Sequence, residues 1–321
     1  MQQCKICGNK ENNNTFLVHE HMFGLKGEFE YFECGNCHCI QLINIPSNLA
    51  DYYPSSHYYS FNLKENLINP VSLANAIRKI QSDHLIFKKR NLAGFILSIG
   101  TVHPYFNWLK KVPIDYHSSI LDVGCGGGDL LFRMRRHGFE NLTGIDPFIE
   151  KDIHVNRVNI YKKEIFDVQE TFDFIMLNHS YEHMDQPLLV LKKLYGLLKP
   201  KSYLLIRIPI SNSYCWQQYG TYWAALDAPR HLYIHSEQSM KILSEKAGFE
   251  IKDIIHDGTA FQFWASEQYK RGICLVDDNS YQVNKRKSIF SKRQIRKYKR
   301  TMQKLNSMHL GGKAQFYLYK K

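Results

Sequence analysis

The feature that most constrains this chain is a run of glycines that follows a short apolar stretch. Residues 121–129 read LDVGCGGGD, so Asp122 is followed by Gly124, Gly126 and Gly128 at every second position. Glycine lets the backbone turn sharply and approach a bound molecule closely. A helix opened by such a turn presents free N–H groups and the positive end of its dipole. The run therefore predicts a strand, a ligand-binding turn and a helix in succession.

A second acidic residue, Asp146, ends the next apolar stretch. A dinucleotide site would require Gly-x-Gly-x-x-Gly, but Asp129 or Leu131 stands where its third glycine should be. A carboxylate at Asp146 can accept hydrogen bonds from both hydroxyls of a ribose. Asp122, directly before the glycines, suits a cationic amino group better than a pyrophosphate. The pair therefore favours S-adenosylmethionine (SAM) over a dinucleotide.

Residues 116–260 alternate short apolar runs with helical patterns, which is typical of a parallel α/β sheet. The helix after Ser236 has a good N-cap residue and a glycine stop at Gly248. We expect strands at 120–123, 142–145, 155–160, 172–177, 203–208, 250–255 and 315–319, and helices at 129–137, 187–198 and 237–247.

These motifs resemble class I SAM-dependent methyltransferases. LDVGCGGG is similar to their first motif and GIDP, at 144–147, to their second, and the Lys199-Pro200 pair before a strand is also typical. The resemblance implies an α/β fold with a Rossmann-like seven-stranded sheet and helices on both faces. It assigns the methionine end of SAM to Asp122, Gly124 and Gly126, with Gly128 in the same loop. Asp146 would bind the ribose, and Asn178 would line the cofactor cleft.

Two Cys-x-x-Cys pairs precede this region. Cys4, Cys7, Cys34 and Cys37 can supply four thiolates from two turns, which suits a closed, structural zinc site. His38 and Cys39 are spare candidates for one ligand. We therefore expect a zinc-binding module at 1–45, a helical linker or lid at 46–115, and a methyltransferase domain at 116–321. A basic helical excursion at about 261–312 would precede the last strand, 315–319.

A similar cysteine-rich head precedes the catalytic domain in a group of sugar methyltransferases. Their carbon-methylating members carry a Tyr-His-Glu-His-Leu run, whereas this chain has Ala228-Pro229-Arg230-His231-Leu232. Because the Tyr and Glu are missing, carbon methylation is disfavoured. The stretch WAALDAPRHLYIHS, at 223–236, resembles a signature of methyltransferases encoded with cell-surface polysaccharide genes. The resemblance implies O-methylation of a sugar or related small-molecule hydroxyl.

Methyl transfer to a hydroxyl requires alignment of the acceptor and removal of its proton. We expect His231 to be the base, with Asp227 as its orienting group and His183 as a weaker candidate; a buried structural role for His231 is an equal alternative. His179-x-x-Glu182-His183 could also be an inverted zinc-protease motif. Its position directly after an expected strand disfavours that interpretation.

The net charge of +12 has a local source. Residues 285–300 hold nine basic side chains and no acidic one, and apolar residues recur at helical spacing from Lys292 onward. Such an amphipathic helix can be a solvated face, a patch for anionic lipid or a lipid-linked glycan precursor, or an RNA-binding surface. Neither the N-terminus nor any other run is apolar enough for a signal peptide or a membrane span. We therefore expect a cytoplasmic protein, with peripheral attachment to a membrane through the basic helix as an alternative.

Two other functions fit parts of the sequence. An RNA methyltransferase would use the cysteine pairs and the basic helix, but the Asn/Asp-Pro-Pro-Tyr/Phe motif of base-amino methylation is missing after the fourth strand. A non-catalytic SAM-binding protein would have an acceptor pocket closed by side chains around His231.

Overall fold

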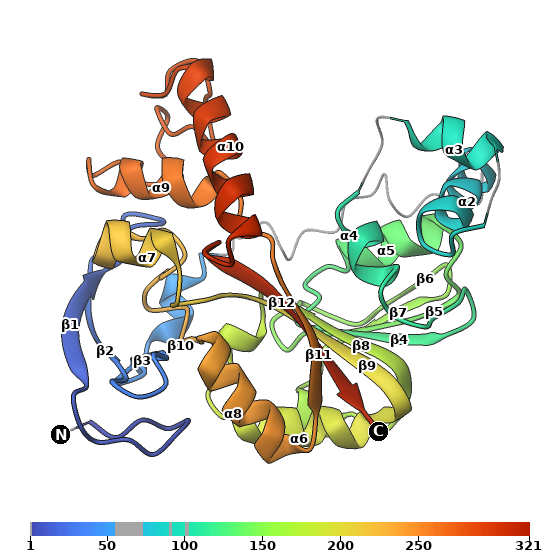
Figure 1. Ribbon diagram of the computed structural model, residues 1–321, viewed down its shortest axis with the longest axis horizontal. Coiled ribbons are helices and arrows are strands. Elements are labelled where there is room, and N and C mark those ends of the chain that lie inside the picture. Colours follow the sequence, from blue (N-terminus) through green and yellow to red (C-terminus); the bar gives the residue numbers. More distant parts are fainter. Residues whose placement is uncertain (1, 55–72, 90–91, 100–102) are drawn as a thin grey trace. The chain divides into compact units, whose positions relative to one another are not determined.

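The computed structural model describes residues 2–54, 73–89, 92–99 and 103–321 (Figure 1). Its contacts divide the chain into two units. The cysteine-rich unit comprises residues 1–58, 179–191 and 206–317, and the glycine-loop unit comprises 59–178, 192–205 and 318–321. The units thus follow spatial packing and not chain order, and the segment boundaries expected from the sequence stay a prediction.

The glycine-loop unit is built on parallel strands. Strand β4 pairs with β5 on one side and with β8 on the other, and β5 pairs with β7. All four are largely buried, as expected for the interior of a parallel sheet. Their bounds are Ser119–Val123 (β4), Asn141–Ile145 (β5), Val158–Tyr161 (β7) and Phe172–Asn178 (β8).

Among the described residues of the glycine-loop unit, helices α2, α3 and α4 precede the sheet. Helix α2 contacts α3, α4 and α5, and α5 packs on β5 and β7. Helix α5 buries Leu131, Phe132 and Met134, so its apolar face is the one turned to the strands. The bounds are Leu73–Leu85 (α2), Leu92–Ser98 (α3), Tyr105–Leu109 (α4) and Asp129–Arg136 (α5), with a 3₁₀ turn at Ile165–Asp167 (η3).

The expected third strand, 155–160, is not one strand. Strand β6 (Ile153–Val155) runs antiparallel to β7, with Val155 opposite Val158. Asn156 and Arg157 between them have φ of 52° and 65°. Two consecutive residues with positive φ form the tight hairpin turn that matches the twist of the flanking strands. The larger sheet therefore has an extra edge strand, and the expectation of seven strands was wrong.

Within the residues that the structure describes, the larger sheet has eight strands in the order β11-β12-β9-β8-β4-β5-β7-β6. Strands β9 (Leu198–Pro209) and β12 (Lys313–Lys320) contribute residues to both units, whereas β11 (Glu250–His256) lies in the cysteine-rich unit. The α/β, Rossmann-like character predicted from the sequence is confirmed, as are the strands expected near 203–208, 250–255 and 315–319.

The cysteine-rich unit contains a second sheet in the order β1-β2-β3-β10. Strands β1 (Asn14–His19), β2 (Glu28–Glu33) and β3 (Ile40–Leu42) form an antiparallel meander, and β10 (Tyr233–Ile234) pairs antiparallel with β3. The N-terminal segment is therefore completed by a strand from nearly 200 residues later in the chain. This pairing places the cysteine pairs and the 223–236 stretch in one packed body.

The helices of the later chain have clear start and stop signals. Helix α8 begins after Ser236, whose side chain forms a capping box with Ser239, and stops at Gly248 in the left-handed conformation, as predicted. Among the described residues, every helix is too short or too polar to traverse a bilayer. The bounds are Leu49–Tyr52 (η1), Tyr181–His183 (η4), Pro187–Leu197 (α6), Tyr214–Tyr219 (α7), Gly220–Tyr222 (η5), Glu237–Ala247 (α8), Phe261–Tyr269 (α9) and Lys292–Ser307 (α10).

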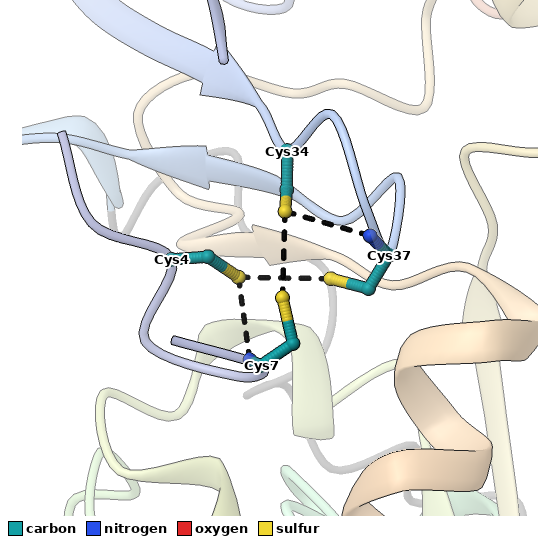
Figure 2. A group of neighbouring side chains, drawn as sticks. All are labelled: Cys4, Cys7, Cys34 and Cys37. Atoms are coloured by element: carbon teal, nitrogen blue, oxygen red, sulfur yellow. Dashed lines mark hydrogen bonds between the residues drawn. The ribbon is translucent and has the colours of Figure 1, made fainter. Parts of the chain in front are cut away.

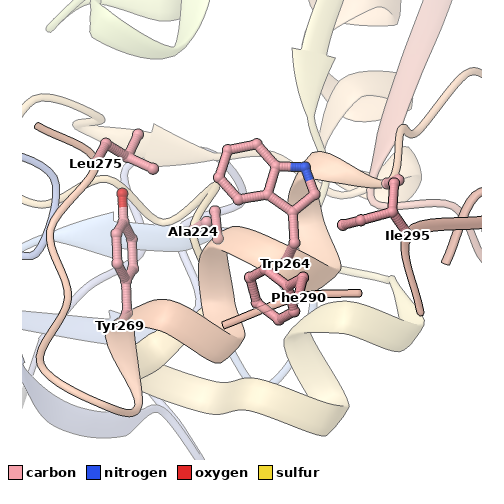
Figure 3. Close-up of a cluster of buried hydrophobic side chains, with 8 residues drawn as sticks. Ala224, Trp264, Tyr269, Leu275, Phe290 and Ile295 are labelled. Carbon is pink, nitrogen blue, oxygen red and sulfur yellow. The ribbon is translucent and has the colours of Figure 1, made fainter. Parts of the chain in front are cut away.

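The segment after β11 packs through an aromatic cluster (Figure 3). Trp264 and Tyr269 of α9 and Ile295 of α10 are buried in it together with Phe290, and Phe263 stacks on Tyr298 with ring centroids 5.2 Å apart. Helix α10 buries Ile295, Met302 and Leu305, so its apolar stripe is used inside the protein. The nine basic residues of 285–300 are all exposed.

Candidate functional site

The glycine loop joins β4 to α5 in the glycine-loop unit. Gly124, Gly126 and Gly128 have φ of 74°, 53° and 81°, which is the left-handed region that favours glycine. A Cβ on Gly128 would lie 2.2 Å from Cδ1 of Ile160, so no other residue fits there without movement. The glycines therefore permit the sharp turn between β4 and α5 that the sequence predicts, and its role in ligand binding stays a prediction.

The two acidic residues of this loop have different environments. Asp146 accepts hydrogen bonds from the backbone N–H groups of Gly126 and Phe148, each at 2.9 Å. Asp122 is buried, and its Oδ1 has no hydrogen-bond partner among the described residues. Burial raises the pKa of Asp122 to about 7, and the carboxylate of Asp146 adds to the shift.

The environments of Asp122 and Asp146 suit the two polar ends of SAM. A buried carboxylate oxygen without a hydrogen-bond partner, such as Oδ1 of Asp122, is stabilised by a nearby cation, and the ammonium at the methionine end of SAM is a cation. Asp146 uses one site on each oxygen and keeps others for ribose hydroxyls. Asn178 ends β8, the strand next to β4. Asp122, Gly124, Gly126, Gly128, Asp146 and Asn178 would hold the cofactor, which supplies an electrophilic methyl group.

The four cysteines of the two pairs converge in the cysteine-rich unit (Figure 2). The Sγ atoms of Cys4 and Cys37 are 3.6 Å apart, those of Cys7 and Cys34 are 3.5 Å apart, and all four lie within 4.8 Å of one another. Tetrahedral zinc with four thiolates has sulfurs roughly 3.8 Å apart. The thiolate set therefore has the separation and chemistry that suit zinc.

Donors around the sulfurs support the same interpretation. Gln41 Nε2 donates to Cys4 Sγ at 2.9 Å, and the backbone N–H of Cys37 lies 3.5 Å from Cys34 Sγ. Such outer hydrogen bonds orient and stabilise metal-bound thiolates. The spare candidates lie outside the group: Cys39 Sγ is 3.9 Å from His235 Nδ1, and His38 Nδ1 is 3.9 Å from Glu33.

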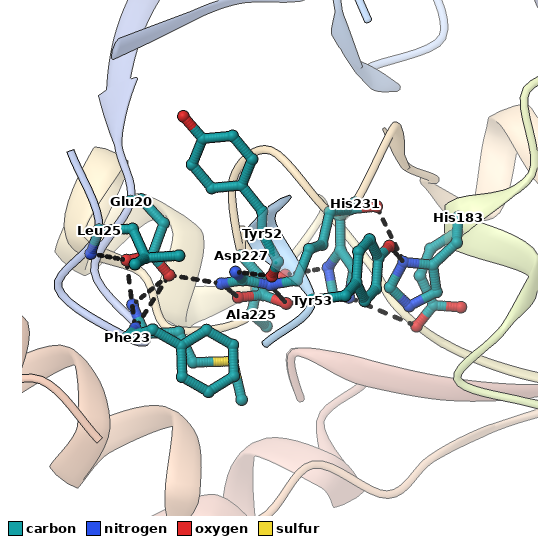
Figure 4. A network of polar contacts seen from close by, with 12 residues as sticks. Glu20, Phe23, Leu25, Tyr52, Tyr53, His183, Ala225, Asp227 and His231 are labelled. Carbon is teal, nitrogen blue, oxygen red and sulfur yellow. Dashed lines mark hydrogen bonds and ion pairs between the residues drawn. The ribbon is translucent and has the colours of Figure 1, made fainter. Parts of the chain in front are cut away.

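The three residues expected to be catalytic lie together in the cysteine-rich unit (Figure 4). His231 Nε2 is 3.8 Å from Asp227 Oδ2. The rings of His183 and His231 meet edge to face with centroids 4.7 Å apart. Asp227 has φ of 41° and precedes a cis Ala228–Pro229 bond. The structure thus brings these three side chains into one cluster, while their catalytic roles stay a prediction.

Hydrogen bonds define the protonation of both histidines. His231 Nδ1 is 2.8 Å from the carbonyl oxygen of Ala225, and His183 Nδ1 is 2.8 Å from that of Arg230. A carbonyl only accepts, so each Nδ1 carries the proton and each Nε2 carries the lone pair. Burial lowers the pKa of both imidazoles, that of His183 to about 3, and keeps both neutral near pH 7.

Glu182 joins this cluster, although the sequence analysis considered it only within the protease motif. Its Oε1 is 3.9 Å from His231 Nε2 and 3.4 Å from His179 Nδ1. The side chain is fully buried, and burial raises the pKa of Glu182 to about 8. His179 has φ of 55° and only Tyr181–His183 is helical, so the two-histidine helix of an inverted zinc protease does not form.

Arg230 connects the cluster to the N-terminal segment. Its guanidinium donates two hydrogen bonds to Asp227, at 2.6 and 3.1 Å, and one to Glu20 at 2.7 Å. Burial alone would raise the pKa of Asp227, but Arg230 holds it below its ordinary value. Glu20 also accepts backbone N–H groups from Met22, Phe23 and Leu25.

Some functional side chains had no signal in the sequence. Nothing near Glu20 distinguishes it from an exposed surface residue, and only the fold shows its pairing with Arg230. Tyr31, whose hydroxyl donates to the carbonyl of His231 at 2.9 Å, is another such residue. The sequence also offers Tyr58 and Tyr59 as aromatic side chains that could fold over the cofactor, and both lie outside the described residues.

Comparisons with known proteins agree with the interpretation of the glycine loop as part of a methyltransferase. Residues 96–254 match the family model described as a methyltransferase domain. The chain is 26% identical to a tRNA U34 carboxymethyltransferase of Aliarcobacter butzleri (strain RM4018), over 50% of this chain and 54% of that protein. It is 26% identical to a ubiquinone biosynthesis O-methyltransferase of Pseudomonas entomophila (strain L48), over 46% of this chain and 72% of that protein.

Among solved structures, the cyclopropane synthase MmaA2 from Mycobacterium tuberculosis is similar, with 15% identity and a TM-score of 0.44 over 78% of this chain and 100% of that one. The chain spans about half the length of the tRNA enzyme that it matches. The family match of residues 96–254 to a methyltransferase domain agrees with the class predicted from the glycine loop, a SAM-dependent methyltransferase.

Proposed function

We propose that the protein transfers the methyl group of SAM to a hydroxyl of a sugar or a related small molecule. The observation that carries this proposal is the imidazole of His231. Its Nδ1 is bonded to the carbonyl of Ala225, which leaves the Nε2 lone pair to accept a proton from a hydroxyl. In this proposal His231 is the base and Asp227 is its neighbouring carboxylate.

A neutral histidine beside buried carboxylates suits oxygen methylation. A hydroxyl is a weak nucleophile until its proton is removed, and the imidazolium that forms is stabilised by Asp227, 3.8 Å away. The sugar as acceptor is supported by the resemblance of the cysteine-rich head and the 223–236 stretch to sugar and surface-polysaccharide methyltransferases. One of the matched relatives is an O-methyltransferase.

We propose that the four-cysteine cluster holds a structural zinc ion. The sulfur separations and the N–H···S contacts support it. With four thiolates the coordination is complete, so zinc would stabilise the fold and leave no position for a substrate. Because Ser236 Oγ donates to the carbonyl of Cys37, the zinc turn also supports the segment that carries His231.

RNA is the alternative acceptor. The exposed basic residues of α10 and the preceding loop, and the similarity to a tRNA U34 carboxymethyltransferase, favour it. We place it second because the histidine–carboxylate cluster is suited to hydroxyl activation. The basic surface can also bind an anionic lipid that carries the acceptor. A non-catalytic SAM-binding protein is a third possibility, in which no acceptor would be methylated.

The decisive experiment is methyl transfer from labelled SAM, run in parallel on nucleotide sugars, lipid-linked glycans and bulk RNA. We expect label in a sugar fraction. His231→Ala should keep SAM affinity by calorimetry and lower turnover by about 10²–10⁴-fold. Label confined to RNA would establish the alternative, and SAM binding without transfer to any fraction would leave the non-catalytic interpretation.

A further inference from the structure

Three potential metal ligands converge within the histidine–carboxylate cluster. Glu182, His183 and His231 each offer a ligand atom, and these atoms all lie within 4.8 Å of one another. His231 Nε2 is 3.9 Å from Glu182 Oε1. Ligands about 2.1 Å from an octahedral cation are about 3.0 Å apart when adjacent and about 4.2 Å apart when opposite, so the group would have to contract by up to about 1.8 Å to close on a metal ion.

We propose that Glu182, His183 and His231 bind a divalent transition-metal ion of the Mn²⁺ type, which coordinates the acceptor hydroxyl. This inference rests on the proposed hydroxyl methylation and changes the role of one residue within it. In the metal-loaded protein the Nε2 of His231 is a ligand, and the metal ion takes over activation of the hydroxyl.

The unpartnered state of Glu182 is an independent observation that points to a cation. Neither carboxylate oxygen has a hydrogen-bond partner in the part of the chain that the structure describes, and the side chain is fully buried. A buried carboxylate without a partner is costly unless a cation or a proton compensates it. His179 Nδ1 lies 3.4 Å from Glu182 Oε1 but makes no hydrogen bond with it.

The two histidines are oriented as metal ligands are. Metal-binding imidazoles nearly always donate their other ring N–H to a carbonyl or carboxylate, which directs the lone pair to the metal. Here the carbonyls of Ala225 and Arg230 accept from Nδ1 of His231 and His183. Both partners belong to the 223–236 stretch, so the backbone that positions one ligand also orients the other.

The charges of the surrounding network favour a dication. Glu182, Asp227 and Glu20 supply three carboxylates, whereas Arg230 is the guanidinium that pairs with two of them. Fully ionised, these four side chains carry a net charge of −2. The positive charges of Arg207 and Lys313 lower the pKa of Glu182, but both side chains are already paired with Asp257.

Two imidazoles and one carboxylate prefer Mn²⁺, Fe²⁺, Co²⁺ or Zn²⁺ to Ca²⁺ and leave positions on the ion open. A hydroxyl bound there becomes more acidic. Its O–H proton passes to solvent, the oxygen forms a bond to the methyl carbon of SAM, and the electrons of the C–S bond remain on sulfur. The products are a methyl ether and S-adenosylhomocysteine. Two adjacent hydroxyls could bind together, so a vicinal diol is the acceptor class that fits best.

The test uses the full chain with zinc retained at the cysteine site. Mn²⁺ is titrated and the free ion is followed by electron paramagnetic resonance, a readout that needs no acceptor. We expect about one Mn²⁺ per chain, with affinity lowered at least tenfold in Glu182→Gln and unchanged in Glu237→Gln, whose carboxylate pairs with His256 outside the cluster. If Glu182→Gln does not fold, His183→Asn replaces it, with folding judged by circular dichroism.

An activity measurement complements the titration. Once an acceptor is known, chelation should lower methyl transfer at least tenfold, and Mn²⁺ should restore it. Failure to bind Mn²⁺, or binding that is unaffected by Glu182→Gln, would overturn the metal site but leave His231 as the base. Mn²⁺ bound at Glu182 in a protein that methylates no hydroxyl would retain the metal site and refute the proposed function.

Discussion

The guanidinium of Arg230 donates a 2.7 Å hydrogen bond to the carboxylate of Glu20, 210 positions earlier, and both side chains are fully buried. Arg230 also holds Asp227 and lies 4.8 Å from the ring of Phe23. The pair therefore fastens the cysteine-bearing N-terminal segment to the stretch that carries the candidate base.

Glu20→Gln should destabilise the protein by about 3 kcal/mol, because breaking a buried ion pair leaves a poorly compensated charge. The measurement is urea unfolding followed by tryptophan fluorescence. The control is Glu28→Gln, which removes an exposed pair with His19 and should change stability by less than about 0.5 kcal/mol. Equal shifts for the two variants would show that the buried pair is not structurally important.

Asp122→Asn should weaken SAM binding at least tenfold, because the ammonium group loses a buried ionic partner. Asp146→Ala should abolish binding through loss of the ribose contacts and of the hydrogen bond from Gly126. Isothermal titration calorimetry measures both. Asp167→Asn, at an exposed position of the same unit, is the control, and native affinity in Asp122→Asn would refute the cofactor assignment.

Asp122 should also make the SAM-free protein less stable as pH rises. Its pKa is about 7 in the folded chain, against an ordinary value of 3.8. The folded state thus favours the protonated carboxyl. The contribution of Asp122 to the free energy of folding is therefore fully present below about pH 4 and is lost as pH rises through about 7. Thermal melting should show Asp122→Asn gaining on the native protein between pH 5 and pH 8, and an equal difference at both values would contradict the pKa.

Elemental analysis should find about one zinc per chain. Cys34→Ser should lose it and unfold at a lower temperature, because metal binding contributes to folding. Cys274→Ser, a cysteine outside the cluster, should retain zinc. Native protein that contains no zinc after purification without chelators would remove the proposal.

Replacing Arg293 and Arg296 by glutamine should weaken binding to vesicles of anionic lipid by about tenfold or more, since each basic side chain contributes about 1 kcal/mol. Both side chains are exposed, so folding should be unchanged. Lys162 and Lys163, also exposed, provide the charge-matched control when replaced by glutamine. Vesicle flotation measures binding, and equal retention of both variants would assign α10 a purely solvated role.

Several features follow from the amino-acid sequence alone because their causes are local. Glycines at 124, 126 and 128 require a turn between β4 and α5, and Ser236 with Gly248 delimits α8. The two Cys-x-x-Cys turns likewise present their sulfurs from short segments. The third strand was misjudged because an alternating apolar pattern is the same in one strand and in a tight hairpin. Only the positive φ angles of Asn156 and Arg157 distinguish the two.

The tertiary structure alone decided which distant side chains share a buried environment. Strand β10 completes the sheet of β1–β3, and this pairing brings Glu20 to Arg230 and Tyr31 to His231. It also buries Glu182 beside the imidazoles of His183 and His231. No local pattern encodes such contacts, because the free energy of a buried charge depends on partners that packing selects from other segments.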